Sequence, residues 1–308
     1  MKGKQGLVCM GLLLVLSSCH TGKQITASGL QRKDFQTEVN GQHTDLFTLS
    51  NKQGMEVCIT NYGARVVSIL VPDRNGKRED VVCGFSTITE YMEQRQNFGS
   101  TVGRYIGRIL NARFTLDGVE YKLVPNNGKS GHISHGGNPG FADRIWKVEQ
   151  ADTHRVRLSY LSPDGENGFP GNLKVTLVYS LGEDDNALDL TYEATTDAPT
   201  VLNLSHHSFF NISGNFTKSV EDQQLWVDAD RFTPYDDKKC VTGEYLQVAG
   251  TPLDFRMPHA IGECIDADHP QLKVVNGYDH TWELNTKGDD TRPVSYTHLR
   301  AHETEADL

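Results

Sequence analysis

Apolar and polar side chains alternate along most of the 308-residue chain, and a few stretches are apolar almost without interruption. Alternation with a period of two is typical of a β-strand that buries one face, and a short apolar run fits a strand buried on both faces. The pattern therefore predicts strands throughout, at residues 55–60, 64–71, 155–161, 173–180, 187–195, 200–205, 225–229 and 281–284.

Two dipeptides mark tight turns between predicted strands. Asn75-Gly76 follows the apolar run, and Asp117-Gly118 separates the alternating segments 114–116 and 119–121. Both dipeptides are favoured in two-residue hairpin turns, which need positive φ angles. The sequence predicts one helix, at residues 87–95, and shows no internal repeat. The expected fold class is all-β, a single large antiparallel β-sandwich over residues 41–293.

The first 18 residues have the pattern of a secretory signal peptide. Lys2 and Lys4 precede an apolar run at residues 7–16, and Leu16-Ser17-Ser18-Cys19 resembles a bacterial lipobox. That motif implies cleavage before Cys19 and a lipid anchor on it. An ordinary signal peptide with an incidental Cys19 is the alternative. We expect an exported, membrane-anchored protein of a bacterial cell envelope, with a flexible polar tether at residues 19–40.

Charge and cysteine content narrow the class of ligand. The formal net charge is −10 and no basic cluster is present, which argues against nucleic acid and multiply phosphorylated partners. A neutral small molecule remains. None of the cysteines at 58, 83, 240 and 264 belongs to a CxxC pair. Because Cys58 and Cys83 lie in apolar runs, we expect buried free thiols there in preference to disulfides.

Three segments place histidine or aspartate where a site could form. Residues 131–137 (GHISHGG) predict a loop whose glycines let the backbone approach a ligand while His135 points into a cleft. In residues 201–211 a strand carries His206 and His207 to opposite faces. Asp279 directly precedes a strand. Each segment also has a structural explanation: a surface turn, a satisfied core histidine, or a turn aspartate bonded to backbone amides.

In their order along the chain, these segments resemble the motifs of the aldose 1-epimerase, or galactose mutarotase, family. The resemblance rests on GRYIGRI at residues 103–109, SHGG at 134–137, NLSHHSFFN at 203–211 and GYDH at 277–280. Connecting stretches at residues 61–64, 229–234 and 250–256 are also similar, and the resemblance extends from about residue 44 to residue 293. It implies the galactose mutarotase-like supersandwich.

The resemblance also implies a reaction, the interconversion of the α and β anomers of a free hexose without a metal or other cofactor. Opening the ring requires a base at the C1 hydroxyl and an acid at the ring oxygen. By the resemblance, His207 is the acid and His135 binds and orients the sugar near the same oxygen. Arg108 would donate hydrogen bonds to the sugar, and Asp279 would accept them from its hydroxyls.

The chain departs from the family pattern in several places. His206 and Gly107 stand where Asn is usual, so hydrogen bonds near the site are expected to be rearranged. The family's general base is a Glu later than GYDH, and we expect no counterpart in these 308 residues. Residues 294–308 look like a non-native tail without strand pattern, in which Glu303 and Glu305 are not expected to replace the base. Without its last strands, the sandwich is expected to be destabilised and poorly active.

Two further functions stay open on the sequence. A non-catalytic, carbohydrate-binding lipoprotein could use the same sandwich and would not need the missing Glu. A sugar-phosphate epimerase of the same superfamily would need additional basic groups for the phosphate, and the acidic balance argues against it.

Overall fold

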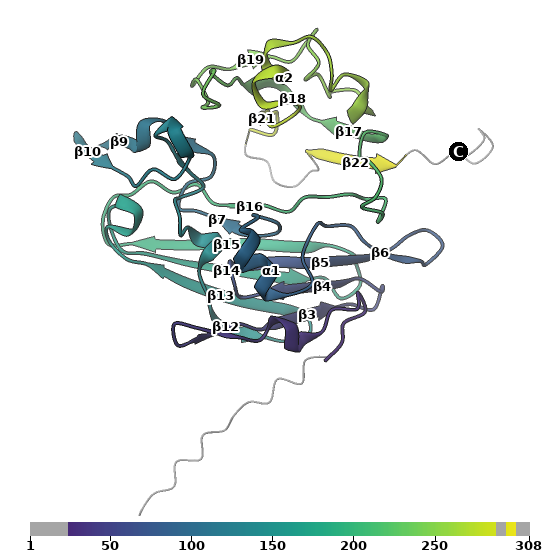
Figure 1. Cartoon of the computed structure of the whole chain (residues 1–308). Helices are drawn as coiled ribbons and strands as arrows, with labels where there is room; N and C mark the ends of the chain where they lie inside the picture. Colours follow the sequence, from purple (N-terminus) through teal and green to yellow (C-terminus); the bar gives the residue numbers. More distant parts are fainter. Residues whose placement is uncertain (1–23, 288–293, 300–308) are drawn as a thin grey trace, which may run out of the picture.

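Two four-stranded antiparallel sheets pack face to face (Figure 1). The computed structural model describes residues 24–287 and 294–299, so the predicted signal peptide, Cys19, Glu303 and Glu305 lie outside the described residues. The first sheet consists of β3 (Leu46–Ser50), β4 (Glu56–Thr60), β5 (Arg65–Pro72) and β6 (Arg78–Asp80). The second consists of β12 (Lys147–Ala151), β13 (Arg155–Ser162), β14 (Leu173–Leu181) and β15 (Leu188–Thr196). The predicted all-β sandwich is confirmed.

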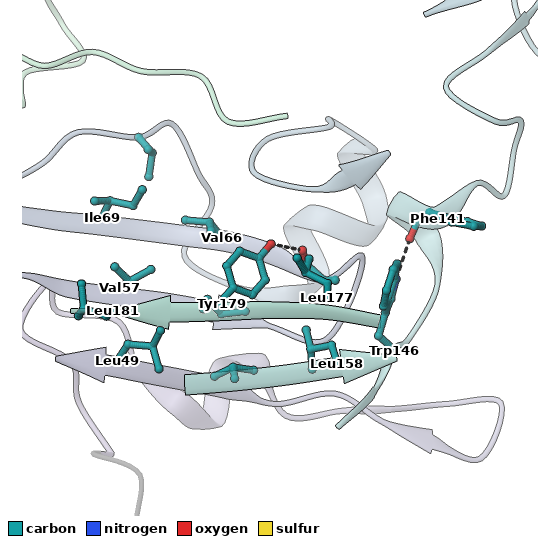
Figure 2. Packing of buried hydrophobic residues seen from close by; sticks show 14 of the residues in the cluster. Leu49, Val57, Val66, Ile69, Phe141, Trp146, Leu158, Leu177, Tyr179 and Leu181 are labelled. Carbon is teal, nitrogen blue, oxygen red and sulfur yellow. Dashed lines mark hydrogen bonds between the residues drawn. The ribbon is translucent and has the colours of Figure 1, made fainter. Parts of the chain in front are cut away.

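The main apolar core fills the space between these sheets (Figure 2). Every second side chain of β14 points inward, so Val175, Leu177 and Tyr179 are fully buried against the strands of the first sheet. Burial of one such side chain stabilises the fold by about 1.5–3 kcal/mol. The Tyr179 hydroxyl donates a hydrogen bond of 2.7 Å to the Ala64 carbonyl, which satisfies the polar end of a buried ring.

A third layer covers the outer face of the first sheet. Its elements are α1 (Ile88–Gln94), which begins after the N-cap Thr87, and the 3-10 helix η1 (Arg32–Phe35). Phe35 and Tyr91 are fully buried there with Cys58 of β4. All residues of β4 are therefore buried, including Glu56 and Thr60 at its two ends.

The prediction of a flexible tether at residues 19–40 is wrong for residues 24–40. Phe35 is buried, the Ala27 backbone N–H donates to the Glu56 carboxylate at 2.6 Å, and the Arg32 guanidinium is paired with Asp45. The hairpin of β1 (Glu38–Val39) and β2 (Gln42–His43) follows. A single phenylalanine gives no periodic pattern, so the sequence did not indicate that this polar segment packs on the sheet.

Both predicted hairpins are present, but residues 73–77 connect β5 to β6, so only the second hairpin has a two-residue turn. β9 (Arg113–Leu116) and β10 (Val119–Lys122) pair around Asp117 and Gly118, whose φ angles are 50° and 79°. The strand predicted at residues 200–205 is wrong over most of its length, because only Ser205 belongs to a strand there. The four cysteines at 58, 83, 240 and 264 are free thiols, as expected, although Cys83 is only half-buried.

Two short ladders lie between the sandwich and the C-terminal part of the chain. β7 (Thr101–Val102) pairs with β16 (Ser205–His206), and β8 (Arg108–Ile109) pairs with β11 (Ile133–Ser134). Single-turn 3-10 helices connect the surrounding segments: η2 (Leu110–Ala112), η3 (Gly128–Ser130), η4 (Phe141–Asp143) and η5 (Glu166–Gly168). These ladders bring together the segments that carry the candidate site.

The C-terminal part forms two three-stranded sheets above the sandwich (Figure 1). One holds β17 (Gln223–Val227), β20 (His259–Ala260) and β22 (Ser295–Leu299), and the other holds β18 (Ala229–Thr233), β19 (Leu246–Gln247) and β21 (Thr281–Leu284). η6 (Ile261–Glu263) and α2 (Pro270–Val275) connect them. The sequence did not predict α2, whose six residues are too few to show a helical period.

The expectation that residues 294–308 lack strand structure is wrong for β22. Its backbone pairs antiparallel with β17 from Ser295 to Leu299. β17 is the central strand of its sheet, between β20 and β22, and the N–H and C=O groups along one of its sides pair with the backbone of β22 whatever the side-chain pattern of that segment. Among the described residues, no helix has the length and apolar character that crossing a membrane requires.

Candidate active site

The β8–β11 ladder places Arg108 beside the segment that carries His135. Ser134 is the register partner of Arg108, and the His135 backbone N–H donates to the Gly107 carbonyl at 2.9 Å. The Gly107 N–H in turn donates to Nδ1 of His135 at 3.2 Å. Because Nδ1 accepts this bond, the neutral ring carries its proton on Nε2. His135 can therefore donate a hydrogen bond from Nε2.

The β7–β16 ladder positions His207. Its N–H donates to the Ser100 carbonyl at 2.8 Å, and its carbonyl accepts from Gly99 at 3.0 Å. The preceding His206 bonds to the Ser208 hydroxyl at 2.6 Å and packs at 6.2 Å from the Tyr179 ring. The two histidines thus face opposite ways, as their alternation along an extended segment predicted.

His135 and His207 meet edge to face. Their ring centroids are 5.1 Å apart and the ring planes are perpendicular. Phe209 packs against His207 at 5.0 Å, which gives that imidazole an apolar neighbour. Two imidazoles from segments far apart in the sequence therefore lie within reach of one small ligand.

Burial keeps both imidazoles in the neutral state more readily than in water. Burial, with the nearby His207 and Arg108, lowers the pKa of His135 to about 4. Burial also lowers the pKa of His207, with a smaller contribution from Arg65, but there a backbone hydrogen bond and the Asp279 carboxylate oppose the shift. His207 therefore retains a proton more readily than His135 does.

Arg108 and Asp279 bring opposite charges to the histidine pair. The Arg108 guanidinium donates to the Lys239 carbonyl at 3.0 Å, while its Nε is buried with no hydrogen-bond partner. Asp279 is exposed, and its backbone carbonyl accepts a 2.8 Å hydrogen bond from the Tyr235 hydroxyl. The charge of Arg108 acts on His135, and that of Asp279 acts on His207.

A polar cleft of about 280 Å³ lies next to this constellation. Arg108 and His135 line it, whereas His207 and Asp279 do not. The remaining wall is rich in side chains that bond hydroxyl groups: Arg95, Asn97, Asn126, Asn127, Asn138 and Asp143. Over residues 24–287 and 294–299, no group of three His, Cys, Asp or Glu side chains is arranged to hold a metal ion.

The two glycines after His135 also have a packing role, which the sequence did not predict. A Cβ on Gly136 would overlap the Gly103 carbonyl oxygen, and one on Gly137 would lie 2.5 Å from Nδ2 of Asn167. The glycines therefore allow this loop to pack against two other segments of the protein, and Gly137 also lines the cleft.

Sequence reasoning missed several groups around the site. Tyr235 bonds Asp279, and the Lys239 carbonyl bonds Arg108. Asn167 bonds the loop that follows His135. Tyr235 directly follows the family-like stretch at residues 229–234, which was a usable signal. Asn167 lies in an ordinary Gly-rich turn, and nothing in the sequence distinguished it.

Comparison with known proteins gives the class to which this fold and site belong. The signature of the aldose 1-epimerase family matches residues 45–307. Galactose mutarotase of Sus scrofa is 38% identical over 238 residues, covering 77% of this chain and 66% of the relative. Aldose 1-epimerase of Escherichia coli K12 is 36% identical over 257 residues, covering 83% of this chain and 73% of the relative.

Solved structures agree in fold. The galactose 1-epimerase of Lactobacillus acidophilus NCFM superimposes with a TM-score of 0.74 at 31% identity, covering 85% of this chain and 74% of that one. An aldose epimerase homologue from C. elegans superimposes with a TM-score of 0.72 at 30% identity, covering 83% of this chain and 75% of that one. The chain belongs to the aldose 1-epimerase family, and it spans 66% of the length of the porcine relative.

Proposed function

We propose that this protein is an aldose 1-epimerase, an isomerase that interconverts the α and β anomers of a free hexose such as galactose or glucose. The observation that carries the proposal is the perpendicular His135–His207 pair, whose ring centroids are 5.1 Å apart, with the charge of Arg108 acting on His135 and that of Asp279 acting on His207. Membership of the family supports the same activity.

His207 is the general acid in this proposal. Ring opening transfers a proton to the ring oxygen as the C1 hydroxyl loses one, and a positioned imidazole can give and retake that proton. Of the two histidines, His207 holds a proton more readily, because a backbone hydrogen bond and Asp279 favour its charged form, while the neighbouring His207 and Arg108 disfavour that of His135. His135, neutral and protonated on Nε2, donates a hydrogen bond to the sugar.

Arg108 and Asp279 orient the sugar. The buried Nε of Arg108 has a free donor, and a sugar hydroxyl or ring oxygen would satisfy it. Asp279 accepts from sugar hydroxyls, and an epimer that cannot pair with it would leave a desolvated carboxylate. After the ring opens, rotation about C1–C2 and closure on the other face give the second anomer.

The family resemblance implies a glutamate as the general base that takes the proton of the C1 hydroxyl. Among the described residues, the Asp279 carboxylate favours the charged form of His207, the proposed acid.

The protein is also proposed to be exported and lipid-anchored through Cys19. The lipobox-like stretch at residues 16–19 supports this. Metabolic labelling with a radioactive fatty acid is expected to mark the wild type and to leave Cys19→Ala unlabelled. Labelling of the variant would refute the anchor.

Polarimetry tests the activity directly. Freshly dissolved α-D-galactose or α-D-glucose is expected to reach its equilibrium rotation faster with the protein than in buffer. A protein that binds these sugars without accelerating the change would be a carbohydrate-binding protein. One that accelerates only phosphorylated sugars would be a sugar-phosphate epimerase, and either result overturns the proposal.

A further inference from the structure

The loop that carries His135 has a strained backbone and needs external support. His135 has a φ of 51°, in the left-handed region that residues other than glycine rarely adopt. Gly136 and Gly137 follow with φ of 81° and 109°, so three consecutive residues depart from ordinary extended or helical geometry. Such a conformation persists where surrounding contacts over-determine it.

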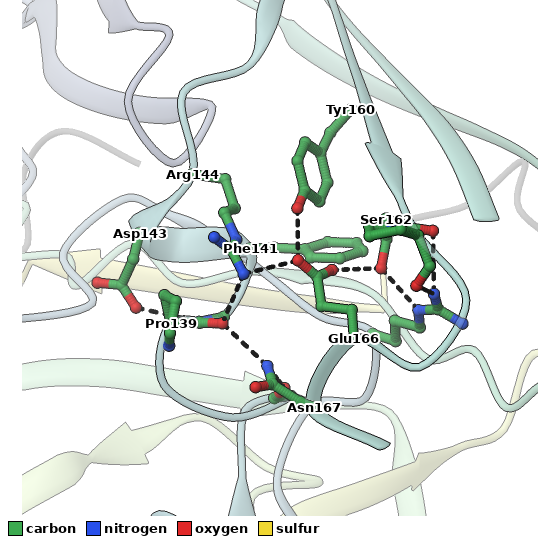
Figure 3. A network of polar contacts seen from close by, with 12 residues as sticks. Pro139, Phe141, Asp143, Arg144, Tyr160, Ser162, Glu166 and Asn167 are labelled. Carbon is green, nitrogen blue, oxygen red and sulfur yellow. Dashed lines mark hydrogen bonds and ion pairs between the residues drawn. The ribbon is translucent and has the colours of Figure 1, made fainter. Parts of the chain in front are cut away.

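Asn167 provides two of these contacts from a different part of the chain. Its Nδ2 donates to the Gly136 carbonyl and to the Pro139 carbonyl, both at 2.9 Å, and Figure 3 shows the bond to Pro139. One amide thus spans the loop from the residue after His135 to the residue before Gly140. Because Gly137 has no Cβ, the amide can lie directly against the loop.

The turn that bears Asn167 is itself held firmly. Glu166 accepts hydrogen bonds from the Tyr160 hydroxyl at 2.6 Å and from the Ser162 hydroxyl, and it is ion-paired with Arg144 at 2.6 Å (Figure 3). The Asn167 carbonyl accepts from the Val124 N–H at 3.0 Å. The Asn167 side chain therefore projects from an anchored turn rather than from a mobile loop.

We propose that Asn167 is a positioning residue for His135. Its two hydrogen bonds fix the loop so that Gly107 can bond Nδ1 of His135, and Nε2 then carries the proton and faces the sugar. The inference rests on the proposed function, since an effect of Asn167 on the catalytic rate presumes that the protein turns over an aldose. Its effect on the tautomer of the His135 ring does not depend on turnover.

Two variants and one control test the proposal. Asn167→Gly removes the amide at a residue whose φ of 51° glycine tolerates, and Asn167→Asp keeps the shape but replaces the donor by an acceptor. The control is Asn40→Gly, at an exposed turn residue with a φ of 53°. Each variant is measured by kcat/KM with α-D-galactose and by ¹⁵N chemical shifts of the histidine rings at pH 7.

The expected result is a kcat/KM at least about tenfold below wild type in both Asn167 variants, because misplacing a binding group weakens catalysis steeply. The His135 ring nitrogens are expected to change from a single Nε2–H tautomer to a mixture, while Asn40→Gly matches wild type in both measurements. Unchanged His135 ring shifts, or unchanged kcat/KM in an active protein, overturn the proposal. If the wild type turns over no aldose, the proposed function fails, and the ring shifts alone decide the role of Asn167.

Discussion

Replacing Gly136 by alanine tests whether the loop after His135 must pack as closely as the structure has it. The new Cβ would lie 2.5 Å from the Arg104 backbone nitrogen and would overlap the Gly103 carbonyl oxygen. Real Cβ atoms keep at least 3.0 Å from such atoms. The closest of these contacts, 1.8 Å to the Gly103 carbonyl oxygen, must open by at least about 1.2 Å, and the shift passes directly to His135.

The size of the effect follows from that shift. A displacement of this order in a binding group lowers kcat/KM by roughly tenfold to a hundredfold. Overpacking costs about 1–3 kcal/mol of stability, and alanine at a φ of 81° adds about 1–2 kcal/mol. The variant is expected to fold, with a clear loss of activity.

Gly131→Ala is the matched control. Gly131 has a φ of 71° and no atom within 4 Å of a Cβ placed on it, so the backbone cost is similar and the overlap is absent. Polarimetry with α-D-galactose and urea denaturation are run on both variants. Equal activity of Gly136→Ala and Gly131→Ala would refute the reasoning.

Three further predictions concern stability and association. Phe35→Ala is expected to lower the free energy of unfolding, measured by urea denaturation, by about 3–5 kcal/mol, because Phe35 is fully buried. An unchanged denaturation midpoint would indicate that residues 24–40 are a flexible tether after all. Burial lowers the pKa of His206 to about 4, below its ordinary value. The contribution of neutral His206 to the free energy of unfolding is therefore full above about pH 6.5. It is lost as the pH falls toward 4, by on the order of 3 kcal/mol. A free energy of unfolding that stays constant over that range would contradict this. β15 is a nine-residue edge strand, and an unpaired strand edge can pair with another molecule. Size-exclusion chromatography is expected to show self-association that Thr191→Lys reduces, and a monomeric wild type would argue against it.

Local rules predicted the sandwich well because its strands follow them. On β14 the alternation of apolar and polar residues determines which face is buried, and Asp117-Gly118 determines one turn. The same rules failed where packing by distant residues decides the outcome. Phe35 is held by Tyr91 and Cys58, and the segment 200–204 is extended without strand partners for most of its length.

The candidate site was predicted in part for a related reason. Arg108, His135, His207 and Asp279 stand in recognisable motifs, and the structure brings His135 and His207 into direct contact. Asn167 acts through the geometry of a folded turn, to which its immediate sequence neighbours give no clue. The His135 tautomer depends on the Gly107 N–H, a contact 28 residues away along the chain.

The central claim is that His207 gives its proton to the ring oxygen of a bound aldose. Exchange NMR measures the rate at which the anomers of D-galactose interconvert at equilibrium. His206→Ala is the matched histidine control, because that ring faces Tyr179. The account predicts that His207→Ala lowers the protein-dependent exchange rate by about a hundredfold or more, whereas His206→Ala retains most of it. Exchange by His207→Ala at the wild-type rate would contradict the account.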